Sequence, residues 1–322
     1  MIRCLLRQVP GLAKAYRAAM RLVAPGFHGA HAISGRGAPL RERPRYVSEW
    51  LTSPVVLREC VFPRLDGLDW YSFLRQECAP LPRGRCLSLC CGDGSVERDL
   101  VRSGICQMCE GVDISSAAID ACRREAAAAG LASLAYRVED VETIELPAAS
   151  YDLVIAWMAL HHIHDLPRLF GQVQRALRSG GLFVMNEYVG PDRFQLPSAQ
   201  VALINEWIGR LPGRLRIASD GTTRTGWTRP SAEYVAGIDP SESVSSHQIL
   251  PAVERTFVTV DRIDYGGGLL QWVLHDIAQN FDPGNAEDMI WLRRLRDAER
   301  DLTARGVLAS DFCLMIARSP LS

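Results

Sequence analysis

The stretch LSLCCGDG, residues 87–94, decides the fold class of this chain. It consists of a short apolar run and a turn with two glycines, and the pattern of a helix over residues 95–102 follows at once. An apolar run, a tight turn and a helix in this order predict the first strand–turn–helix unit of an α/β sheet. A glycine-rich turn at this place also lets the backbone approach a ligand closely.

Four more apolar runs continue the alternation of strand and helix toward residue 190. The second run ends at Gly111-Val112-Asp113, and a serine-capped, alanine-rich helix over residues 115–129 follows it and stops at Gly130. The near-continuous apolar run YDLVIA is typical of a strand buried on both faces, which favours a parallel sheet. The further predicted elements are strands over residues 134–138, 151–156 and 182–185, and a helix over residues 166–177 that Ser179-Gly180-Gly181 breaks.

The alternation stops after Gly190 and resumes near the end of the chain. Residues 191–255 are richer in proline, arginine and serine, and we predict that they form an inserted acceptor lid. Strands are expected over residues 257–265 and 311–317, joined by helices over residues 269–280 and 286–305.

These elements predict a Rossmann-like, doubly wound seven-stranded sheet, mostly parallel with an antiparallel last strand. An N-terminal helical segment and the lid complete the expected architecture. We divide the chain into a helical cap segment over residues 1–82, a cofactor-binding core over 83–190, the lid over 191–255, and the remaining strands and helices of the core over 256–322.

Composition places the chain among ordinary globular proteins and excludes some partners. With 48% hydrophobic and 23% charged residues, 322 residues suffice for one α/β domain with sizeable additions. The formal net charge of −1 supplies no overall field for a phosphate backbone, so we expect no nucleic-acid partner. Arginine, lysine and proline interrupt the basic residues 1–26, so we expect no signal peptide, no membrane span and a cytoplasmic location. Monomer and homodimer both stay open.

The ten cysteines are scattered along the chain, and reduced thiols are the default where no export signal precedes them. Cys106 and Cys109 have the spacing of metal ligands, but no second pair lies at a useful distance. We therefore predict small buried hydrophobic side chains at these positions and no metal site.

The glycine turn and a later acid indicate a nucleoside-containing cofactor. Gly92 and Gly94 form the turn, and Asp113 ends the next strand about 20 positions later, where a carboxylate can accept hydrogen bonds from ribose hydroxyls. A dehydrogenase uses the same device with the spacing G-x-G-x-x-G. Position 97 is glutamate, so the third glycine of that fingerprint is missing and the dehydrogenase is the weaker hypothesis.

Five motifs in register extend this hypothesis to a family. LSLCCGDG (87–94), EGVDIS (110–115), VEDV (138–141), YDLVIAWMALHHI (151–163) and LRSGGLFVMNEY (177–188) resemble the successive motifs of class I S-adenosylmethionine-dependent methyltransferases. The resemblance covers roughly residues 83–190 and is closest to the small-molecule, methyltransferase type 11-like branch. The segments NEYVGPDRFQ (186–195), DYGGGLL (264–270) and GVLASDF (306–312) resemble a bacterial subgroup associated with glycan or natural-product methylation.

The resemblance implies S-adenosylmethionine as the cofactor and assigns roles to individual positions. Gly92 and Gly94 would shape the turn against the methionine moiety, and Asp113 would bind the ribose hydroxyls. The residues implied at the adenine are Ile114, Asp140 and the backbone of Val141, and the set also includes Cys90 and Trp157.

The chain departs from the family pattern at two positions. Cys90 stands where the first glycine of the turn is usual, and Ser88 stands where an acidic residue is common. We expect Cys90 to be tolerated at a position with ordinary dihedral angles. The alternative is a crowded methionine pocket, which would keep open a catalytically inactive, cofactor-binding scaffold subunit.

Methyl transfer from a sulfonium is an in-line displacement, so catalysis rests largely on positioning and desolvation. A hydroxyl acceptor must also lose its proton, and a general base can remove it. Candidate bases follow the fourth and fifth strands at the carboxyl edge of the sheet: His161 or His162 first, and Glu187 second. The same histidines, with His164, would equally suit a loop that only hydrogen-bonds backbone groups.

Residues after the fifth strand are the candidates for acceptor binding. Tyr188, Arg193 and Gln195 lie nearest the expected acceptor. The lid adds a basic group that could clamp a carboxylate or phosphate, although a solvated basic loop is equally compatible with the arginine-rich composition. Its members are Arg210, Arg214, Arg216, Arg224 and Arg229.

The function predicted from sequence is methyl transfer from S-adenosylmethionine to a small polar acceptor, a hydroxyl of a glycan or secondary metabolite. The alternative within the class is N- or S-methylation of an amino-acid-like carboxylate. The inactive scaffold and the dehydrogenase are the alternatives from other classes.

Overall fold

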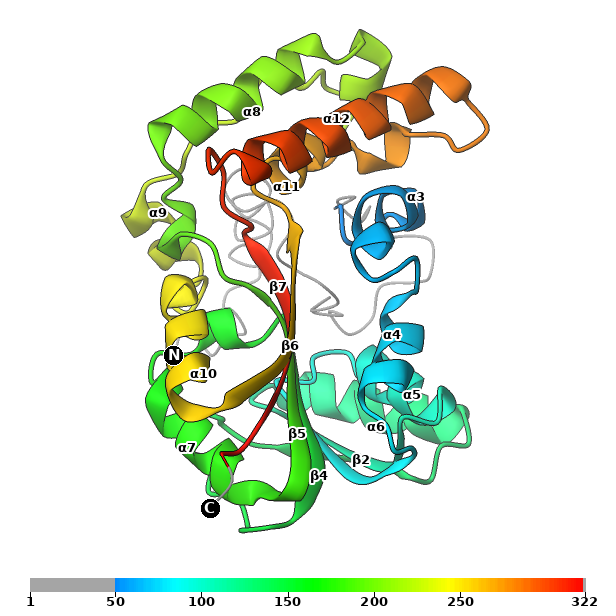
Figure 1. Ribbon diagram of the computed structural model, residues 1–322, viewed down its shortest axis with the longest axis vertical. Helices are drawn as coiled ribbons and strands as arrows, with labels where there is room; N and C mark the ends of the chain where they lie inside the picture. Colours follow the sequence, from blue (N-terminus) through cyan, green and yellow to red (C-terminus); the bar gives the residue numbers. More distant parts are fainter. Residues whose placement is uncertain (1–49, 321–322) are drawn as a thin grey trace.

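The computed structural model describes residues 50–320, which form one seven-stranded sheet with helices on both faces (Figure 1). The strand order is β3-β2-β1-β4-β5-β7-β6, with parallel pairing from β3 to β5. β7 pairs antiparallel with both β5 and β6. The predicted fold class is therefore confirmed. The strands are β1 Arg83–Leu89, β2 Cys106–Asp113, β3 Leu134–Val138, β4 Tyr151–Trp157, β5 Leu177–Tyr188, β6 Val258–Gly266 and β7 Phe312–Arg318.

The central strands bury side chains on both faces, which explains their continuous apolar sequence. In β4, Leu153 and Ile155 enter the core on one face, and Val154 and Ala156 enter the core on the other. Figure 1 shows α4, α5 and α6 on the first side of the sheet and α7 and α10 on the opposite side. Their bounds are α4 Trp70–Glu77, α5 Ser95–Arg102, α6 Ser116–Ala128, α7 Leu166–Ala176 and α10 Ile249–Thr256.

The predicted fifth strand and the predicted helix over residues 269–280 have other bounds in the structure. The Ser179-Gly180-Gly181 stretch lies inside β5, which starts at Leu177 and crosses a register shift against β4. The predicted helix over residues 269–280 is only the short α11, Leu270–Leu274, followed by a 3-10 turn at Ala278–Asn280. His275 has a ψ of 129°, so the backbone leaves the helical path directly after Leu274, and Asp276 follows with a φ of 54°.

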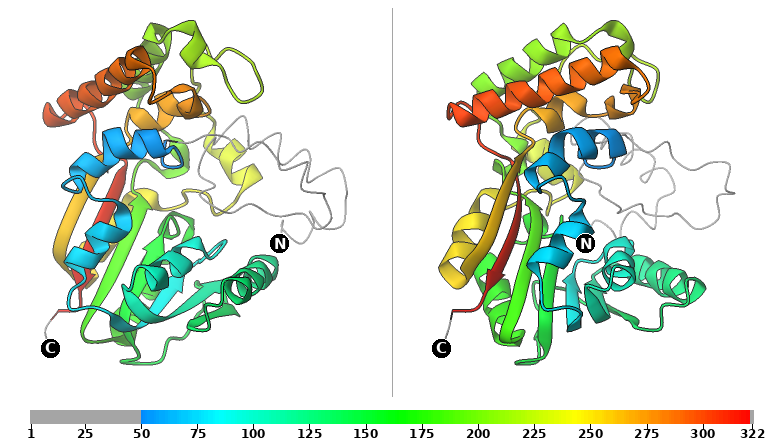
Figure 2. Two further views of the ribbon diagram at one scale, coloured as in Figure 1. Left: turned by 90° about the vertical axis from the view of Figure 1, so that its right-hand side faces the viewer. Right: turned by 45° about the vertical axis from the view of Figure 1, so that its right-hand side comes forward.

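A helical cap lies at the end of the sheet where the parallel strands finish (Figures 1 and 2). It combines segments that are distant in sequence, because α8 packs against α11, α11 against α12, and α12 against the π-helix Leu57–Val61. α10, which belongs to the predicted lid, packs against α7 on the sheet instead. The remaining helices are α3 Pro54–Val56, α8 Ser198–Arg210, α9 Ala232–Ile238 and α12 Ala286–Ala304.

The predicted division into four segments stays a prediction. Its N-terminal segment is helical over the part that the structure describes, residues 50–82, and residues 1–49 lie outside the description. Within residues 50–320, no helix is both long and apolar enough to cross a membrane.

The triple-glycine motif after β6 is a packing device between cap and sheet. A Cβ at Gly267 would lie 2.3 Å from the Phe312 ring, and Gly267 itself has a φ of 91°. The buried carboxylate of Glu299, on α12, accepts hydrogen bonds from the backbone N–H groups of Gly267, Leu269 and Leu270. α12 therefore fixes the start of α11.

Asp311 joins the sheet to the cap from a buried position directly before β7. Its carboxyl lies 3.3 Å from Gln200 Nε2 on α8 and 3.4 Å from Trp272 Nε1 on α11. Burial raises the pKa of Asp311 to about 7, and the two hydrogen bonds oppose this shift only in part.

Replacing Asp311 by asparagine should flatten the pH dependence of stability. The pKa is raised in the folded state, so the folded protein binds the proton that the unfolded chain has lost. The free energy of unfolding should therefore fall as pH rises from about 4 to about 7, by up to about 1.4 kcal/mol per pH unit. Urea unfolding at several pH values measures this, and Asp297→Asn, at an exposed position of α12, is the matched control. Equal slopes for wild type and Asp311→Asn would contradict the assignment.

Candidate cofactor and active site

The turn after β1 lies at the point where the strand order reverses. β1 pairs with β2 on one side and with β4 on the other. The connections that follow β1 and β4 therefore run in opposite directions, and ligands of open α/β sheets bind between such loops. In this turn, Gly92 N donates to Asp113 Oδ2 at 3.1 Å, and Ser115 N donates to Asp113 Oδ1 at 2.8 Å. The carboxylate at the end of β2 thus holds the turn and the start of α6, and its remaining lone pairs can accept further hydrogen bonds.

Both glycines of the turn are required by its geometry. Gly92 and Gly94 have φ values of 57° and 75°, where residues with a Cβ are strained. A Cβ at Gly94 would lie 2.8 Å from Cys122 Sγ and 2.9 Å from Tyr136 Oη. The turn therefore packs directly onto α6 and β3, and the roles of both glycines at the cofactor stay predictions.

The expectation of ordinary dihedral angles at Cys90 is wrong. Cys90 has a φ of 51°, in the left-handed region that a glycine adopts without strain. Burial raises the pKa of its thiol, and the carboxyls of Asp113 and Glu187 raise it further. A cysteine thus holds a backbone conformation that favours glycine, and the packing around the turn maintains the strain.

The expected adenine residues lie at the adjoining ends of β2 and β3. Glu139 N donates to the Asp113 carbonyl at 3.0 Å, which places the loop with Asp140 beside Asp113. Asp140 accepts a hydrogen bond from Glu142 N, and Val141 is buried. Ile114 is 60% exposed. An exposed isoleucine beside a buried carboxylate suits contact with a flat apolar ligand face.

Trp157 ends β4 on the side of the N-terminal helices. Its ring lies parallel to that of Tyr71, with centroids 6.4 Å apart, and edge-on to that of Trp70, with centroids 5.6 Å apart. Trp157 is partly exposed, so α4 covers one part of the ring and leaves another part accessible.

The candidate bases that follow β4 and β5 form one buried network. Glu187 Oε1 accepts from Ala159 N at 2.5 Å and from Leu160 N at 2.7 Å, and Glu187 Oε2 lies 2.9 Å from His161 Nδ1. Burial raises the pKa of Glu187 to about 8 against the opposing effect of these N–H donors. Glu187 therefore shapes the loop after β4 and orients His161.

His162 and His164 have different surroundings. His162 is partly exposed, its ring centroid lies 4.3 Å from that of His161, and its Nδ1 lies 3.1 Å from Ser241 Oγ. His164 is exposed and lies 3.1 Å from Glu142. The structure thus brings His161, His162 and Glu187 together and leaves His164 apart.

The three expected acceptor residues are tied to the protein itself. Tyr188 is fully buried and donates to the Pro191 carbonyl at 3.0 Å. Arg193 donates to the carbonyls of Asp239, Pro240 and Glu242, and Gln195 donates to those of Arg193 and Pro230. Their acceptor-binding roles stay predictions. The hydrogen bonds of Arg193 hold the segment around residue 240 in place.

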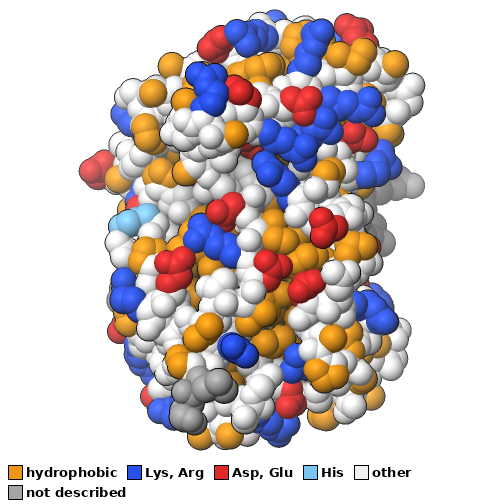
Figure 3. Space-filling view, viewed as in Figure 1, with side chains coloured by type: hydrophobic (Ala, Val, Ile, Leu, Met, Phe, Trp, Pro, Cys, Tyr) orange, Lys and Arg blue, Asp and Glu red, His pale blue; other side chains and the backbone are white. Residues whose placement is uncertain are grey.

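Most lid arginines also have partners within the cap. Arg214 pairs with Glu287 and Asp288 at the start of α12, and Arg210 pairs with Glu206. Arg224 donates to the carbonyls of Trp272, Val273 and His275 at the end of α11, and burial lowers its pKa to about 10. Arg229 donates to the Leu196 carbonyl. On the face shown in Figure 3, basic side chains gather over the cap end, where α12 lies.

Sequence reasoning missed two buried carboxyls near the site. Glu242 is fully buried, 4.0 Å from His161 Nε2, and burial raises its pKa to about 8. It lies far from His161 in sequence, and no spacing pointed to it. Glu97, on α5, was interpreted only as a missing glycine. It is fully buried, and burial raises its pKa to about 7 while the Ser88 hydroxyl opposes this shift.

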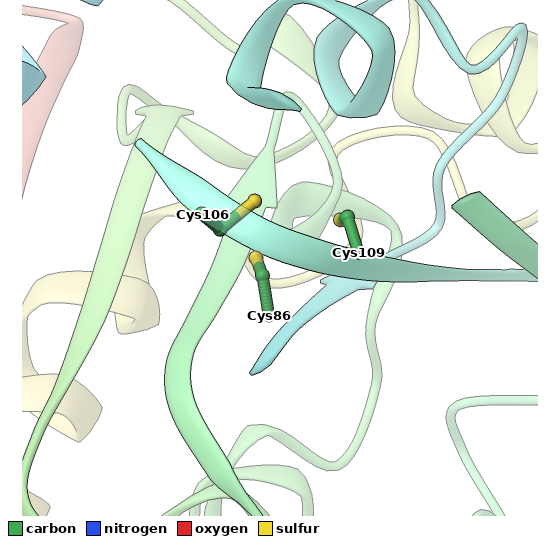
Figure 4. Close-up of side chains that lie close together, drawn as sticks. All are labelled: Cys86, Cys106 and Cys109. Carbon is green, nitrogen blue, oxygen red and sulfur yellow. The ribbon is translucent and has the colours of Figure 1, made fainter. Parts of the chain in front are cut away.

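Cys106 and Cys109 have a third partner that their spacing did not reveal. Figure 4 shows Cys86, on β1, facing the two cysteines of β2, and the three sulfur atoms lie within 4.8 Å of one another. All three side chains are buried in the apolar core on the α5 side.

Comparisons with known proteins identify the core. The sequence profile of the methyltransferase domain family matches residues 87–185. The uncharacterized methyltransferase YcgJ of Bacillus subtilis (strain 168) is 25% identical over 101 residues, 31% of this chain and 40% of that protein. Malonyl-[acyl-carrier protein] O-methyltransferase of Methylovorus sp. (strain MP688) is 43% identical over 53 residues, 16% of this chain and 18% of that protein. The chain thus spans less than half the length of either relative.

A solved structure agrees on the fold. Geranyl diphosphate methyltransferase in complex with S-adenosylmethionine superposes with a TM-score of 0.50 at 16% identity, over 78% of this chain and 84% of that chain. The fold and the glycine turn with Asp113 agree with a class I, S-adenosylmethionine-dependent methyltransferase core, and the matching family profile covers residues 87–185. The predicted class and cofactor are confirmed, and the glycan or natural-product subgroup stays a prediction.

Substitutions at Cys90 should reveal its left-handed conformation. Cys90→Gly should change the free energy of unfolding by no more than about 1 kcal/mol, because relief of strain offsets the lost side-chain contacts. Cys90→Val should cost about 2 kcal/mol or more, because a β-branched residue tolerates this φ least. Urea unfolding of both variants tests this. Equal stability of the two variants would show that the turn does not have this conformation.

Proposed function

We propose that the protein transfers the methyl group of S-adenosylmethionine to a small polar acceptor, most directly a hydroxyl of a glycan or secondary metabolite. The observation that supports this best is the Asp113 carboxylate, which is bonded to the glycine turn at the reversal of strand order and has acceptor capacity left. The exposed Ile114 beside it suits an adenine face.

The polar groups at the ends of β4 and β5 support a hydroxyl acceptor. A hydroxyl must lose its proton as the new C–O bond forms, whereas a thioether has none to lose. His161, His162 and Glu187 lie together at the carboxyl edge of the sheet, and His162 is the partly exposed member. We assign the removal of the acceptor proton to this group.

The N- or S-methylation alternative depended on a free basic lid. Arg210, Arg214, Arg224 and Arg229 have carboxylates or backbone carbonyls as partners, so fewer cations face a carboxylate acceptor than the sequence suggested. The inactive scaffold depended on a distorted turn at Cys90. The left-handed φ of Cys90 retains the glycine-like path, which favours an intact cofactor site.

Calorimetric titration of the full chain with S-adenosylmethionine and, separately, with NAD(H) tests the proposal. We expect saturable binding of the sulfonium cofactor only. Asp113→Asn should weaken it by about 10-fold to 100-fold, because one carboxylate hydrogen bond to a ligand hydroxyl contributes about 1.5–3 kcal/mol. Asp120→Asn, at an exposed aspartate of α6, is the matched control and should bind as wild type does. Binding of NAD(H) alone would revive the dehydrogenase, and no binding of either cofactor would refute the proposal.

Ile114 offers a variant that separates binding from folding. Its side chain is exposed, so Ile114→Ala should change the free energy of unfolding by less than about 0.5 kcal/mol. The same change should weaken S-adenosylmethionine binding by about 3-fold to 10-fold through lost apolar contact with adenine. An unchanged dissociation constant would place the adenine elsewhere. Val260→Ala, at an exposed position of the edge strand β6, is the control.

A further inference from the structure

We propose that His161, His162 and Glu242, together the histidine–glutamate cluster, bind one divalent metal ion of the zinc type. One ligand atom from each of the three residues lies within 4.8 Å of the other two, and His161 Nε2 and Glu242 Oε1 are 4.0 Å apart. Two imidazoles and one carboxylate are a common donor set for such ions, and a small contraction would bring all three to bonding distance.

Each histidine has a second partner in the position that metal-bound histidines use. A ring that binds a metal through Nε2 must carry its proton on Nδ1 and donate it. For His161 the acceptor is Glu187 Oε2, at 2.9 Å. For His162 it is Ser241 Oγ, at 3.1 Å, whose own proton goes to Asp239 Oδ1 at 2.7 Å. Both rings are therefore held with Nε2 as the nitrogen that can bind a cation.

Glu242 is the independent observation that points to a ligand. Its carboxyl is 1% exposed, and its Oε2 has no hydrogen-bond partner among the described residues. Within residues 50–320, neither Glu242 nor Glu187 forms an ion pair with an arginine or lysine side chain. Buried carboxylates are normally paired with a cation or bound to a metal, so a divalent ion would supply the missing positive charge.

Hydrogen bonds on both sides of Glu242 hold its segment beside the histidines. Arg193 holds the carbonyls of residues 239, 240 and 242, Arg193 N donates to the Ser243 carbonyl, and Val244 N donates to the His161 carbonyl at 3.0 Å. The segment from the lid is thus bonded on both sides of Glu242. Arg193 therefore positions the segment that carries Glu242, whereas the sequence predicted only a role in acceptor binding.

Three protein ligands leave a coordination position open, as in catalytic rather than structural zinc sites. Nitrogen ligands disfavour Mg²⁺, which prefers oxygen. With the ion bound, His161 and His162 are ligands and no longer bases. On the proposed function, an acceptor hydroxyl at the open position would then ionise more readily and lose its proton to water, in place of direct removal by the histidines. Its oxygen would then form the new bond to the methyl carbon as the sulfonium S–C bond breaks. The metal site itself does not depend on that step.

Titration of the metal-stripped full chain with Co²⁺ and Zn²⁺, without S-adenosylmethionine, tests the site. We expect one equivalent of Co²⁺ with the d–d absorption of nitrogen and oxygen ligands and no sulfur-to-cobalt charge transfer, displaced by Zn²⁺. Because the titration contains no S-adenosylmethionine, its failure is distinguishable from a failure of the proposed function. Charge transfer from sulfur would place the ion at Cys86, Cys106 and Cys109 and would overturn the proposal.

Variants locate the ion. Glu242→Gln and His162→Gln keep the size of the side chains and should each weaken metal binding by about 100-fold or more. The matched control is His164→Ala, in the same loop, which should bind as wild type does. Circular dichroism confirms that each variant is folded. No binding by the wild-type chain, or unchanged binding by both cluster variants, would overturn the assignment.

Discussion

The Asp113 carboxylate is the constraint on which the cofactor site depends. It accepts the Gly92 N–H of the turn after β1 and the Ser115 N–H at the start of α6, so two loops from neighbouring strands have one fixed relation. Gly92 and Gly94 reach this arrangement with left-handed φ angles, and Cys90 follows the same path at a cost in strain. A buried carboxylate with lone pairs to spare is then available to a ligand at the reversal of strand order.

Glu187 fixes the loops on the proposed acceptor side of the site, as Asp113 does on the cofactor side. Its carboxyl fixes the loop after β4 through two backbone N–H groups and orients His161 through Nδ1. Arg193 follows β5 and donates a hydrogen bond to the Glu242 carbonyl, which holds this part of the lid against the loop after β4. Glu242 therefore lies beside His161. The end of one strand therefore organises both the groups that follow β4 and a segment that lies far away in sequence.

Periodicity predicted the sheet because strands buried on both faces leave a continuous apolar pattern, and β3 over 134–138 and α5 over 95–102 match the structure residue for residue. Local signals failed where tertiary contacts decide. The strand predicted to start at residue 182 starts at Leu177, so the glycines lie inside β5. The helix predicted over residues 269–280 ends at Leu274, because His275 leaves the helical region. The positions of His161, His162 and Glu187 could be predicted from strand ends. Glu242 could not, because hydrogen bonds of Arg193 and Val244 bring its segment to the site. The left-handed φ of Cys90 could not be predicted from the cysteine itself, because only the glycine usual at this position in the family points to it.

The central claim is that Asp113 and the turn at Gly92 hold the nucleoside of S-adenosylmethionine. A crystal structure of the full chain with S-adenosylhomocysteine tests it most directly. The account predicts both ribose hydroxyls within hydrogen-bond distance of the Asp113 carboxylate, and the adenine against Ile114. A product molecule bound elsewhere, or a turn at Cys90 that blocks the methionine portion, would contradict it.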